Sequence, residues 1–340
     1  MVARGHVALV GVTASGKSAL ALALARCRPE AEIVAVDSMT VYRGMDIGTA
    51  KPMPELRAEV PHHLLDLVDP DEEFTVQRFQ TEARRAVADI ERRGHRALLV
   101  GGTALYLRAV VDDLVLPGRW PEVAAALEAE AERPGGLERL YARLAAADPV
   151  AAARITPGNR RRIVRALEVV VGSGRPFSSF GPGLGVYPPT PFVLVGVPFD
   201  PAAADRRIAQ RFEALLAAGF LAEVRTLAAR PGGLSRTARQ ALGYRELLAH
   251  VEEGVPLEEA VATAIARTRA FARRQWAWFR RDPRITWLDP ERDLLEQLVA
   301  KWDGAGEAGG PGGTGGRSTG AACCQGGISH TVAGSRPARD

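Results

Sequence analysis

Short apolar runs recur along the chain and alternate with segments of helical periodicity. The runs are HVALVG (6–11), EIVAVD (32–37), HRALLVGG (95–102), FVLVGV (192–197) and ITWLD (285–289). Runs of this length next to glycine or aspartate are typical of buried strands, and we expect the last to be an edge strand. Because strands that alternate with helices form parallel sheets, the pattern predicts an α/β protein whose parallel sheet is flanked by helices on both faces.

The segments between these runs have the spacing of amphipathic helices. SGKSALALALARC (15–27) follows the first predicted strand. Residues 201–282 are mostly helical in pattern, with breaks at PGG (231–233) and near Gly254. Between the second and third strands, apolar residues recur at steps of three and four, which indicates one buried helix face. These residues are Val76, Phe79, Ala83, Val87 and Ile90.

The interval between the third and fourth strands is too long for a single crossover helix. It contains three helical patterns, PEVAAALEAEAE, LERLYARLAAAD and RRIVRALEVVVG. We therefore predict an inserted helical subdomain at 119–189, between a first core segment at 1–118 and a core completion with basic helices at 190–303. From 304 to 340 the chain is glycine-rich with few apolar residues, which predicts a disordered tail.

Composition agrees with a folded protein that has an anionic partner. Of the 340 residues, 46% are hydrophobic and 25% charged, enough for a sizeable core. The net charge of +4 is a mild basic bias. No apolar run approaches the roughly 18 residues of a membrane span. The three cysteines lack the spacing of a disulfide framework, so we expect a reducing cytoplasm.

A phosphate-binding loop follows the first strand. GVTASGKS matches the pattern G-x-x-x-x-G-K-[ST], and its position between a strand and a helix is the context that such a loop requires. Backbone amides from Thr13 to Ser18 and the charge of Lys17 are expected to surround phosphate oxygens, with Mg²⁺ on the Ser18 hydroxyl. The predicted loop consists of Gly11, Val12, Thr13, Ala14, Ser15, Gly16, Lys17 and Ser18.

The carboxylate that a triphosphate hydrolase needs is not in its usual place. Such enzymes carry it at the end of a later strand, but the third strand ends in glycines and Thr103. Asp37 ends the second strand instead. From the residues alone, it could be a metal ligand, a general base or a helix N-cap.

Seven motifs in a fixed order resemble those of the tRNA dimethylallyltransferase family, also called tRNA isopentenyltransferases. The resemblance runs from about residue 6 to 290. The motifs are GVTASGKS, DSMTVYRGMDIGTAKP, HHLLD, GGTALYLRAV, NRRRIVRALEV, RQALGYREL and TRAFARRQWAWFR.

The resemblance implies an answer for the phosphate loop. Members of that family bind dimethylallyl pyrophosphate there and transfer its prenyl group to N6 of adenine 37 of tRNA, next to the anticodon. By that resemblance, Asp37 is the base that takes the proton of the amine, while Lys17 and Mg²⁺ on Ser18 stabilise the leaving pyrophosphate. Thr103 then contacts the target nucleotide, although capping the following helix is an equally good role for it.

The same resemblance implies a set of contacts with the tRNA anticodon stem-loop. It also implies a cytoplasmic enzyme, and we expect a monomer without an obligate protein partner. The implied tRNA contacts are Asp37, Ser38, Met39, Thr40, Thr103, Arg161, Arg162, Ile163, Val164, Arg165, Arg239 and Gln240.

A basic segment near the end of the helical region supports a nucleic-acid partner. Six arginines lie between Arg267 and Arg281 with no acidic residue among them, and arginines at 267, 274 and 281 share one helical face. Because uncompensated arginines repel one another, we interpret them as an RNA-binding face. The interleaved aromatic residues are expected to be core.

Several residues have an open role or depart from the family pattern. Lys51 could contact phosphate or RNA, or be a surface lysine. The adjacent His62 and His63 are not expected to bind a metal, since no third ligand is nearby. Thr40 replaces a usual glutamine and Ala124 a usual arginine, which puts one RNA contact at each position in doubt. Val12 replaces a usual proline, with little expected consequence.

Three alternative functions stay open. A P-loop kinase or nucleotide hydrolase would split ATP without RNA. An adenylate isopentenyltransferase would prenylate free nucleotide and needs no reader of an anticodon loop. A non-enzymatic RNA-binding module would not depend on Asp37.

Overall fold

The computed structural model of the protein, which describes residues 5–308, is built on one parallel sheet. All strand pairs run parallel, in the order β3-β2-β4-β1-β5-β6. The predicted parallel α/β architecture is therefore confirmed. The strands are β1 (Val7–Val10), β2 (Ala31–Val36), β3 (His62–His63), β4 (Arg96–Gly101), β5 (Val193–Gly196) and β6 (Thr286–Trp287).

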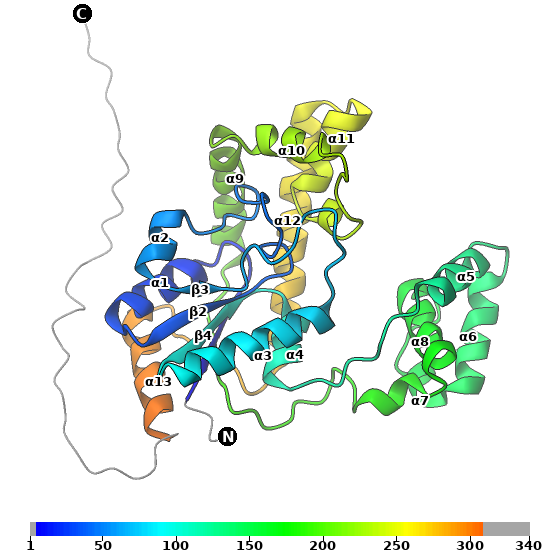
Figure 1. Ribbon diagram of the computed structural model, residues 1–340, viewed down its shortest axis with the longest axis horizontal. Coiled ribbons are helices and arrows are strands. Elements are labelled where there is room, and N and C mark those ends of the chain that lie inside the picture. Colours follow the sequence, from blue (N-terminus) through cyan, green and yellow to red (C-terminus); the bar gives the residue numbers. More distant parts are fainter. Residues whose placement is uncertain (1–4, 309–340) are drawn as a thin grey trace, which may run out of the picture.

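Helices cover both faces of the sheet, as Figure 1 shows. Because successive side chains of a strand point to opposite faces, Val7 and Leu9 of β1 enter one core cluster while Ala8 and Val10 enter another. On the first face lie α1 (Lys17–Cys27) and α13 (Leu294–Ala308). On the second face lie α3 (Val76–Arg92) and α4 (Ala104–Val111).

The edge strand β3 was missed by the sequence analysis, because a strand of two histidines has no apolar pattern. His63 Nε2 lies 2.6 Å from Oε2 of the buried Glu32, whose other oxygen lies 2.7 Å from His95 Nδ1. Arg93 also donates to this carboxylate. Hydrogen bonds from Arg93, His63 and His95 outweigh the cost of burial and lower the pKa of Glu32. His63 therefore pairs with a buried carboxylate.

Lys51 has neither of its two expected roles. It is buried, and its ammonium group donates to Asp46 at 2.7 Å and to Asp66 at 2.6 Å. A further hydrogen bond reaches the carbonyl oxygen of Tyr42. Lys51 therefore fastens the loop between β2 and the short helix α2 (Pro54–Glu59), and it is not exposed to a phosphate or an RNA.

A second group of helices packs beside the phosphate loop and lies at the top of Figure 1. Val12 of that loop forms a small apolar cluster with Ile208 of α9 and Ala272 of α12. These two helices therefore form a wall next to the loop. The group comprises α9 (Pro201–Ala217), α10 (Phe220–Ala228), the 3-10 turn η2 (Ala238–Gln240), α11 (Tyr244–Glu253) and α12 (Leu257–Phe279).

The chain between α4 and β5 forms a separate helical unit, which we call the helical subdomain. It has its own core cluster, which includes Leu140, Leu144, Ile163 and Leu167. Figure 1 shows it to one side of the sheet, joined to the core by two chain segments. The inserted unit is thus present, while its boundaries at 119 and 189 stay a prediction. Its elements are α5 (Pro121–Ala131), α6 (Gly136–Ala147), α7 (Pro149–Ala153), α8 (Arg160–Ser173) and the 3-10 turn η1 (Phe177–Phe180).

Helix α13 extends past Gly304, where the disordered tail was predicted to begin. Trp302 and Ala305 are buried in the cluster that α13 shares with α1 and the sheet. This packing outweighs the low helix propensity of the glycines, so residues 304–308 are helical and that part of the prediction is wrong. The remainder of the predicted tail lies outside the described residues.

Candidate functional site

The phosphate loop joins the carboxyl end of β1 to the first turn of α1. Gly16 precedes the helix with φ +88°, a conformation that favours glycine, and Ala14 has φ +59°. The amides of Lys17 and Ser18 open the helix and have no partner within it. They face outward at the positive end of the helix dipole, which is the arrangement that binds phosphate groups.

Two of the six amides predicted to bind phosphate are already used within the protein. The Thr13 N–H donates to Oε1 of Gln275 at 2.8 Å, and the Ser15 N–H donates to the carbonyl oxygen of Val12 at 3.3 Å. The cradle is thus smaller than the sequence predicted. Its remaining donors are the amides of Ala14, Gly16, Lys17 and Ser18 and the side chain of Lys17.

Lys17 is held ready for an anion. Its Nζ donates to the Val12 carbonyl oxygen at 3.1 Å. Burial lowers the pKa of Lys17 to about 8, against the opposing attraction of Asp37, and the nearby charge of Arg211 lowers it further. A bound pyrophosphate would be a negatively charged partner for this ammonium group and would stabilise its charged form.

Asp37 lies at the same edge of the sheet, after the last residue of β2. Its Oδ1 accepts a hydrogen bond of 2.7 Å from the Met39 N–H, which forms a local turn. No helix follows it, so the N-cap alternative is wrong. Strand β4 separates β2 from β1, which places Asp37 roughly 10 Å from the phosphate loop at two strand spacings. That interval leaves room for a substrate between the two.

Thr103 lies between them, after the end of β4. It occupies the N-cap position of α4, but its side chain makes no capping hydrogen bond. The structure therefore does not support capping as the role of this hydroxyl group. Gly101 allows β4 to approach β2 closely, because a Cβ at this position would lie 2.0 Å from the Val36 carbonyl oxygen.

Three residues of this site were missed by the sequence analysis, and all lie on the helical wall. Gln275 of α12 donates to the Gly102 carbonyl oxygen at 2.9 Å while accepting from Thr13, so it links the phosphate loop to the turn that carries Thr103. Arg207 of α9 donates to the Ala14 carbonyl oxygen at 2.7 Å. Arg211, one helical turn later, lies within electrostatic range of Lys17 and Asp37. The spacing of four residues between Arg207 and Arg211 puts both on one face of a helix, and this was the signal in the sequence that could have found them.

The donor set of the site fits Mg²⁺. This ion takes oxygen ligands and is usually held by one or two protein groups together with substrate phosphates and water. Ser18 is exposed on the first turn of α1, and Asp37 lies close enough to Lys17 to influence its pKa. Within residues 5–308, no group of three or more His, Cys, Asp or Glu side chains could hold a metal ion. A metal here would therefore share its ligands with a phosphorylated substrate.

The basic cluster of α8 has fewer available residues than predicted. Arg161 and Arg162 are exposed, and their contact with tRNA stays a prediction. Arg165 instead donates to the carbonyl oxygens of Pro117 and Gly118.

Two other members of that cluster cannot offer their side chains to RNA. Ile163 and Val164 are buried in the core of the helical subdomain. We therefore remove these side chains from the predicted tRNA contacts.

The stretch after Asp37 also needs correction. Thr40 is only 8% exposed, and Met39 packs against the main core cluster. The side chain of Thr40 does not reach the surface, in line with the doubt that its replacement of glutamine raised. Ser38 is half-buried and keeps its predicted role.

Gln240 lies in an open groove of about 270 Å³ between η2 and α11. It is exposed, whereas the neighbouring Arg239 forms an ion pair with Glu252. Tyr244 is buried and donates to Glu223 at 2.6 Å, which agrees with its expected place in the core. The groove is lined by Arg236, Arg239, Gln240, Arg245, Leu248, Ala249 and Glu253.

The arginines of α12 are partly compensated by acids from other helices, which the sequence could not show. Arg267 pairs with Glu246 of α11 at 2.8 Å, and Arg273 pairs with Asp205 of α9 at 2.6 Å. Arg269 also contacts Asp205. The argument from mutual repulsion is therefore wrong for these three, and for the arginines at 274, 280 and 281 the RNA-binding role stays a prediction. Of the aromatic residues expected to be core, Phe279 is buried and Trp276 packs against the small cluster around Val12, whereas Phe271 and Trp278 are only half-buried.

Comparisons with known proteins agree with this geometry. The model of the IPP transferase family matches residues 40–282. A tRNA dimethylallyltransferase of Salinispora arenicola is 51% identical over 286 residues, which cover 83% of this chain and 82% of that protein.

Solved structures agree as well. A full-length tRNA isopentenylpyrophosphate transferase from Bacillus halodurans has a TM-score of 0.65 and 35% identity, over 90% of this chain and 98% of that one. A eukaryotic dimethylallyltransferase acting on tRNA has a TM-score of 0.70 and 27% identity, and the match covers 89% of this chain and 77% of that one. In the part of the chain that the structure describes, no helix has the length and apolar character needed to cross a membrane.

Proposed function

This chain belongs to the IPP transferase family, and on that premise we propose that it transfers the dimethylallyl group of dimethylallyl pyrophosphate to N6 of adenine 37 in tRNA. The products are N6-isopentenyladenosine and pyrophosphate. The observation that carries the proposal is the gathering of Lys17, Arg211 and Asp37 around one interval at the carboxyl edge of the sheet. The end of β4, next to this interval, carries Gly102 and Thr103 and no carboxylate.

The phosphate loop holds the leaving group. The N-terminal amides of α1 and the ammonium group of Lys17 bind the pyrophosphate of the donor, and the nearby Arg211 adds a second positive charge. As the C1–O bond of the donor breaks, its electron pair stays on pyrophosphate. These fixed donors then stabilise charge that grows in the transition state, which is where stabilisation accelerates a reaction.

Asp37 acts on the other reactant. An exocyclic amine conjugated to a purine is a weak nucleophile, so a positioned carboxylate that removes its proton favours attack. The N6–C1 bond forms while the proton passes to Asp37. Thr103, whose hydroxyl caps no helix, orients the adenine between Asp37 and the loop.

Mg²⁺ is proposed as the cofactor, with Ser18 as its protein ligand. When bound, it adds positive charge beside the phosphate oxygens. The protein's own groups do the rest: Lys17 orients the donor, and Asp37 receives the proton.

The RNA is proposed to bind across the core and the helical subdomain. Arg161 and Arg162 are exposed on α8, and Gln240 is exposed in the groove beside α11. Arginines on such surfaces bind the phosphate backbone, and an amide side chain reads the base edges that a single-stranded loop exposes. A base in such a loop is also the least costly to extract from its stack. We further propose that the enzyme acts as a monomer in the cytoplasm.

The test is transfer by the purified protein. With Mg²⁺, labelled dimethylallyl pyrophosphate and tRNA, nucleoside mass spectrometry should detect N6-isopentenyladenosine, whereas AMP in place of tRNA should give no product. ATP hydrolysis without RNA should be absent. A protein that ignores the prenyl donor and hydrolyses ATP would contradict the proposal, and one that prefers AMP would identify a nucleotide prenyltransferase.

A further inference from the structure

The two chain segments that join the helical subdomain to the core meet at a buried cluster of charges. The first segment leaves α4 at Asp112, and the second enters β5 at Val193. They are tied where they leave the core, because the Thr190 hydroxyl donates to the Val111 carbonyl oxygen at 2.5 Å. The orientation of the subdomain therefore depends on what holds these segments.

Arg108 of α4 reaches from the core to the second segment. Its guanidinium group donates to the carbonyl oxygens of Leu184 at 3.1 Å and Val186 at 2.7 Å, and it pairs with Asp112 of the first segment. Arg108 is 3% exposed. One buried side chain thus contacts both segments.

Arg284, from the turn between α12 and β6, does the same from the other side. It donates to Asp112 at 2.6 Å and to the Pro188 carbonyl oxygen at 2.5 Å, and Asp282 binds it through both carboxylate oxygens. Asp112, whose side chain is fully buried, therefore accepts from an arginine of α4 and from an arginine of the α12–β6 turn.

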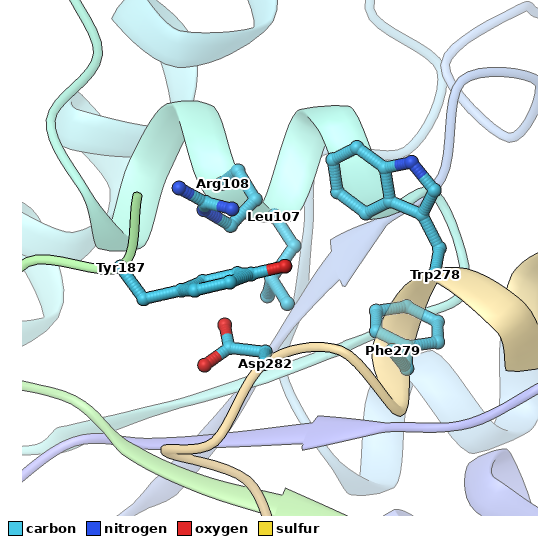
Figure 2. A pocket seen from close by; sticks show the side chains of 6 residues that line it. All are labelled: Leu107, Arg108, Tyr187, Trp278, Phe279 and Asp282. Atoms are coloured by element: carbon cyan, nitrogen blue, oxygen red, sulfur yellow. The ribbon is translucent and has the colours of Figure 1, made fainter. Parts of the chain in front are cut away.

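An aromatic ring completes the cluster. The Tyr187 ring lies 4.6 Å from the guanidinium carbon of Arg108 and 5.5 Å from that of Arg284. Figure 2 shows this ring between Arg108 and Asp282. We call Arg108, Asp112, Tyr187, Asp282 and Arg284 the latch.

The latch is packed too tightly to be a ligand site. The cavity beside it, lined by Leu107, Arg108, Tyr187, Trp278, Phe279 and Asp282, measures about 10 Å³. That is close to the smallest volume that holds a single water molecule. The charges of the latch are therefore satisfied by one another and by backbone carbonyls.

The far end of the first segment is fixed within the subdomain. Arg165 of α8 donates to the carbonyl oxygens of Pro117 and Gly118, and Glu168 accepts from the Trp120 N–H at 2.8 Å. Between these anchors the chain is exposed, as at Val115, which is 68% exposed. Nearer the core, Gln80 of α3 donates to the Leu114 carbonyl oxygen at 2.9 Å, so the latch sets the direction of the subdomain together with this contact.

Buried ion pairs stabilise a fold little more than apolar side chains of similar volume, but their fixed geometry specifies one arrangement. We propose that Arg108, Arg284 and Tyr187 are positioning residues for the RNA substrate, because they hold the helical subdomain, with Arg161 and Arg162, at one orientation to the phosphate-loop site. This inference rests on the proposed function, in which one RNA binds both units.

The test measures prenyl transfer by the variants Arg284→Met and Tyr187→Leu to two RNA substrates, full-length tRNA and a short anticodon-loop oligonucleotide. The KM for full-length tRNA should rise about 10- to 100-fold, since small displacements of binding groups cost that much. The dissociation constant of the donor should not change. The variants should also modify an anticodon-loop oligonucleotide that is too short to reach the subdomain at the wild-type rate. Arg284→Lys should recover part of the loss, and Arg92→Met, on the exposed surface of α3, serves as the control.

Equal losses on both RNAs, or weaker donor binding, would show a merely structural role and overturn the inference. An unchanged KM for tRNA would do the same. If Arg284→Met does not fold, Tyr187→Leu, which removes no charge, carries the comparison.

Small-angle scattering tests the latch without RNA. The distribution of interatomic distances should broaden in the variants relative to the wild type, and an unchanged distribution would overturn the inference. Failure of the proposed function is distinguishable, because the wild-type protein would then modify neither RNA.

Discussion

Single side chains of the site are controlled by a few short contacts. Lys17 is held by the Val12 carbonyl oxygen and Asp37 by the Met39 N–H. Each contact leaves the charged group with capacity for a further partner. The chemistry proposed here depends on that capacity, and it can be tested one residue at a time.

Removing the base is the first such test. Asp37→Asn keeps the size and the turn-forming oxygen of the side chain but is not basic, so the rate of prenyl transfer should fall roughly 10²- to 10⁴-fold. Single-turnover kinetics with saturating donor measure this rate. Asp89→Asn, on the surface of α3, is the matched control and should retain wild-type turnover. Near-normal turnover of Asp37→Asn would exclude its role as base.

The lowered pKa of Lys17 predicts how donor affinity varies with pH. The free protein loses the ammonium charge as the pH rises through about 8. If pyrophosphate binds only the charged form, its dissociation constant should rise about tenfold between pH 7 and 9, as expected for one group titrating at that pKa.

Calorimetric titration with inorganic pyrophosphate and Mg²⁺ measures this dependence. Lys17→Arg stays charged throughout this range, so its profile reports only the titration of the ligand. If the wild type and Lys17→Arg gave parallel profiles, Lys17 would not be the titrating group.

Among the elements, α12 has the largest influence on the site. Gln275 is buried on this helix and links the phosphate loop to the end of β4. The apolar cluster around Val12 presses the same helix, with α9, against the loop. The conformation of the loop therefore depends on a helix far away in the sequence, since Thr13 and Gln275 are 262 residues apart.

Two substitutions of Gln275 should distinguish the effect of its hydrogen bonds on the phosphate loop from the effect of charge beside the bound phosphates. Gln275→Met leaves the Thr13 N–H and the Gly102 carbonyl oxygen without a partner, which should lower the free energy of unfolding by about 1–3 kcal/mol. Gln275→Glu keeps the acceptor for Thr13 but adds a negative charge beside the cradle.

We expect Gln275→Glu to weaken pyrophosphate binding more than Gln275→Met, as measured by calorimetry beside thermal unfolding. Gln297→Met is the control for loss of an amide away from the site, because the half-buried Gln297 of α13 also hydrogen-bonds the backbone N–H and carbonyl oxygen of one residue, Asp289. Equal pyrophosphate affinities in the two Gln275 variants would contradict a position next to the phosphates.

At the scale of the whole molecule, the protein consists of two units with separate cores, and we propose a different role for each. The sheet and its helices carry the proposed donor site, and the helical subdomain supplies exposed arginines. Because the core clusters of the sheet contain no residue of the subdomain, the core should fold without it.

Replacing residues 113–186 by a short glycine-serine linker tests this division. The Thr190 to Val111 hydrogen bond shows that the two ends lie close together, so a short linker can join them. The shortened protein should unfold cooperatively and bind pyrophosphate with unchanged affinity. Its kcat/KM for tRNA should fall by at least about tenfold, because phosphate contacts contribute much of RNA affinity. Loss of pyrophosphate binding in a folded variant would contradict the division.

Much of this protein could be predicted from local patterns. The strand-loop-helix order of GVTASGKS, the apolar runs and the helical spacing all reflect backbone geometry that neighbouring residues impose on one another. For the same reason the parallel sheet and the inserted helices were predicted correctly. The two-residue β3 and the helical residues after Gly304 were not predicted, because tertiary packing rather than a local pattern stabilises them.

The partners of polar groups required the folded chain, because they come from distant segments. Nothing local shows that Asp205 neutralises Arg273, that Gln275 occupies the Thr13 amide, or that Lys51 is buried between two aspartates. Hydrogen bonds and ion pairs act over a few ångströms, so which of them form depends on how the helices and strands pack together.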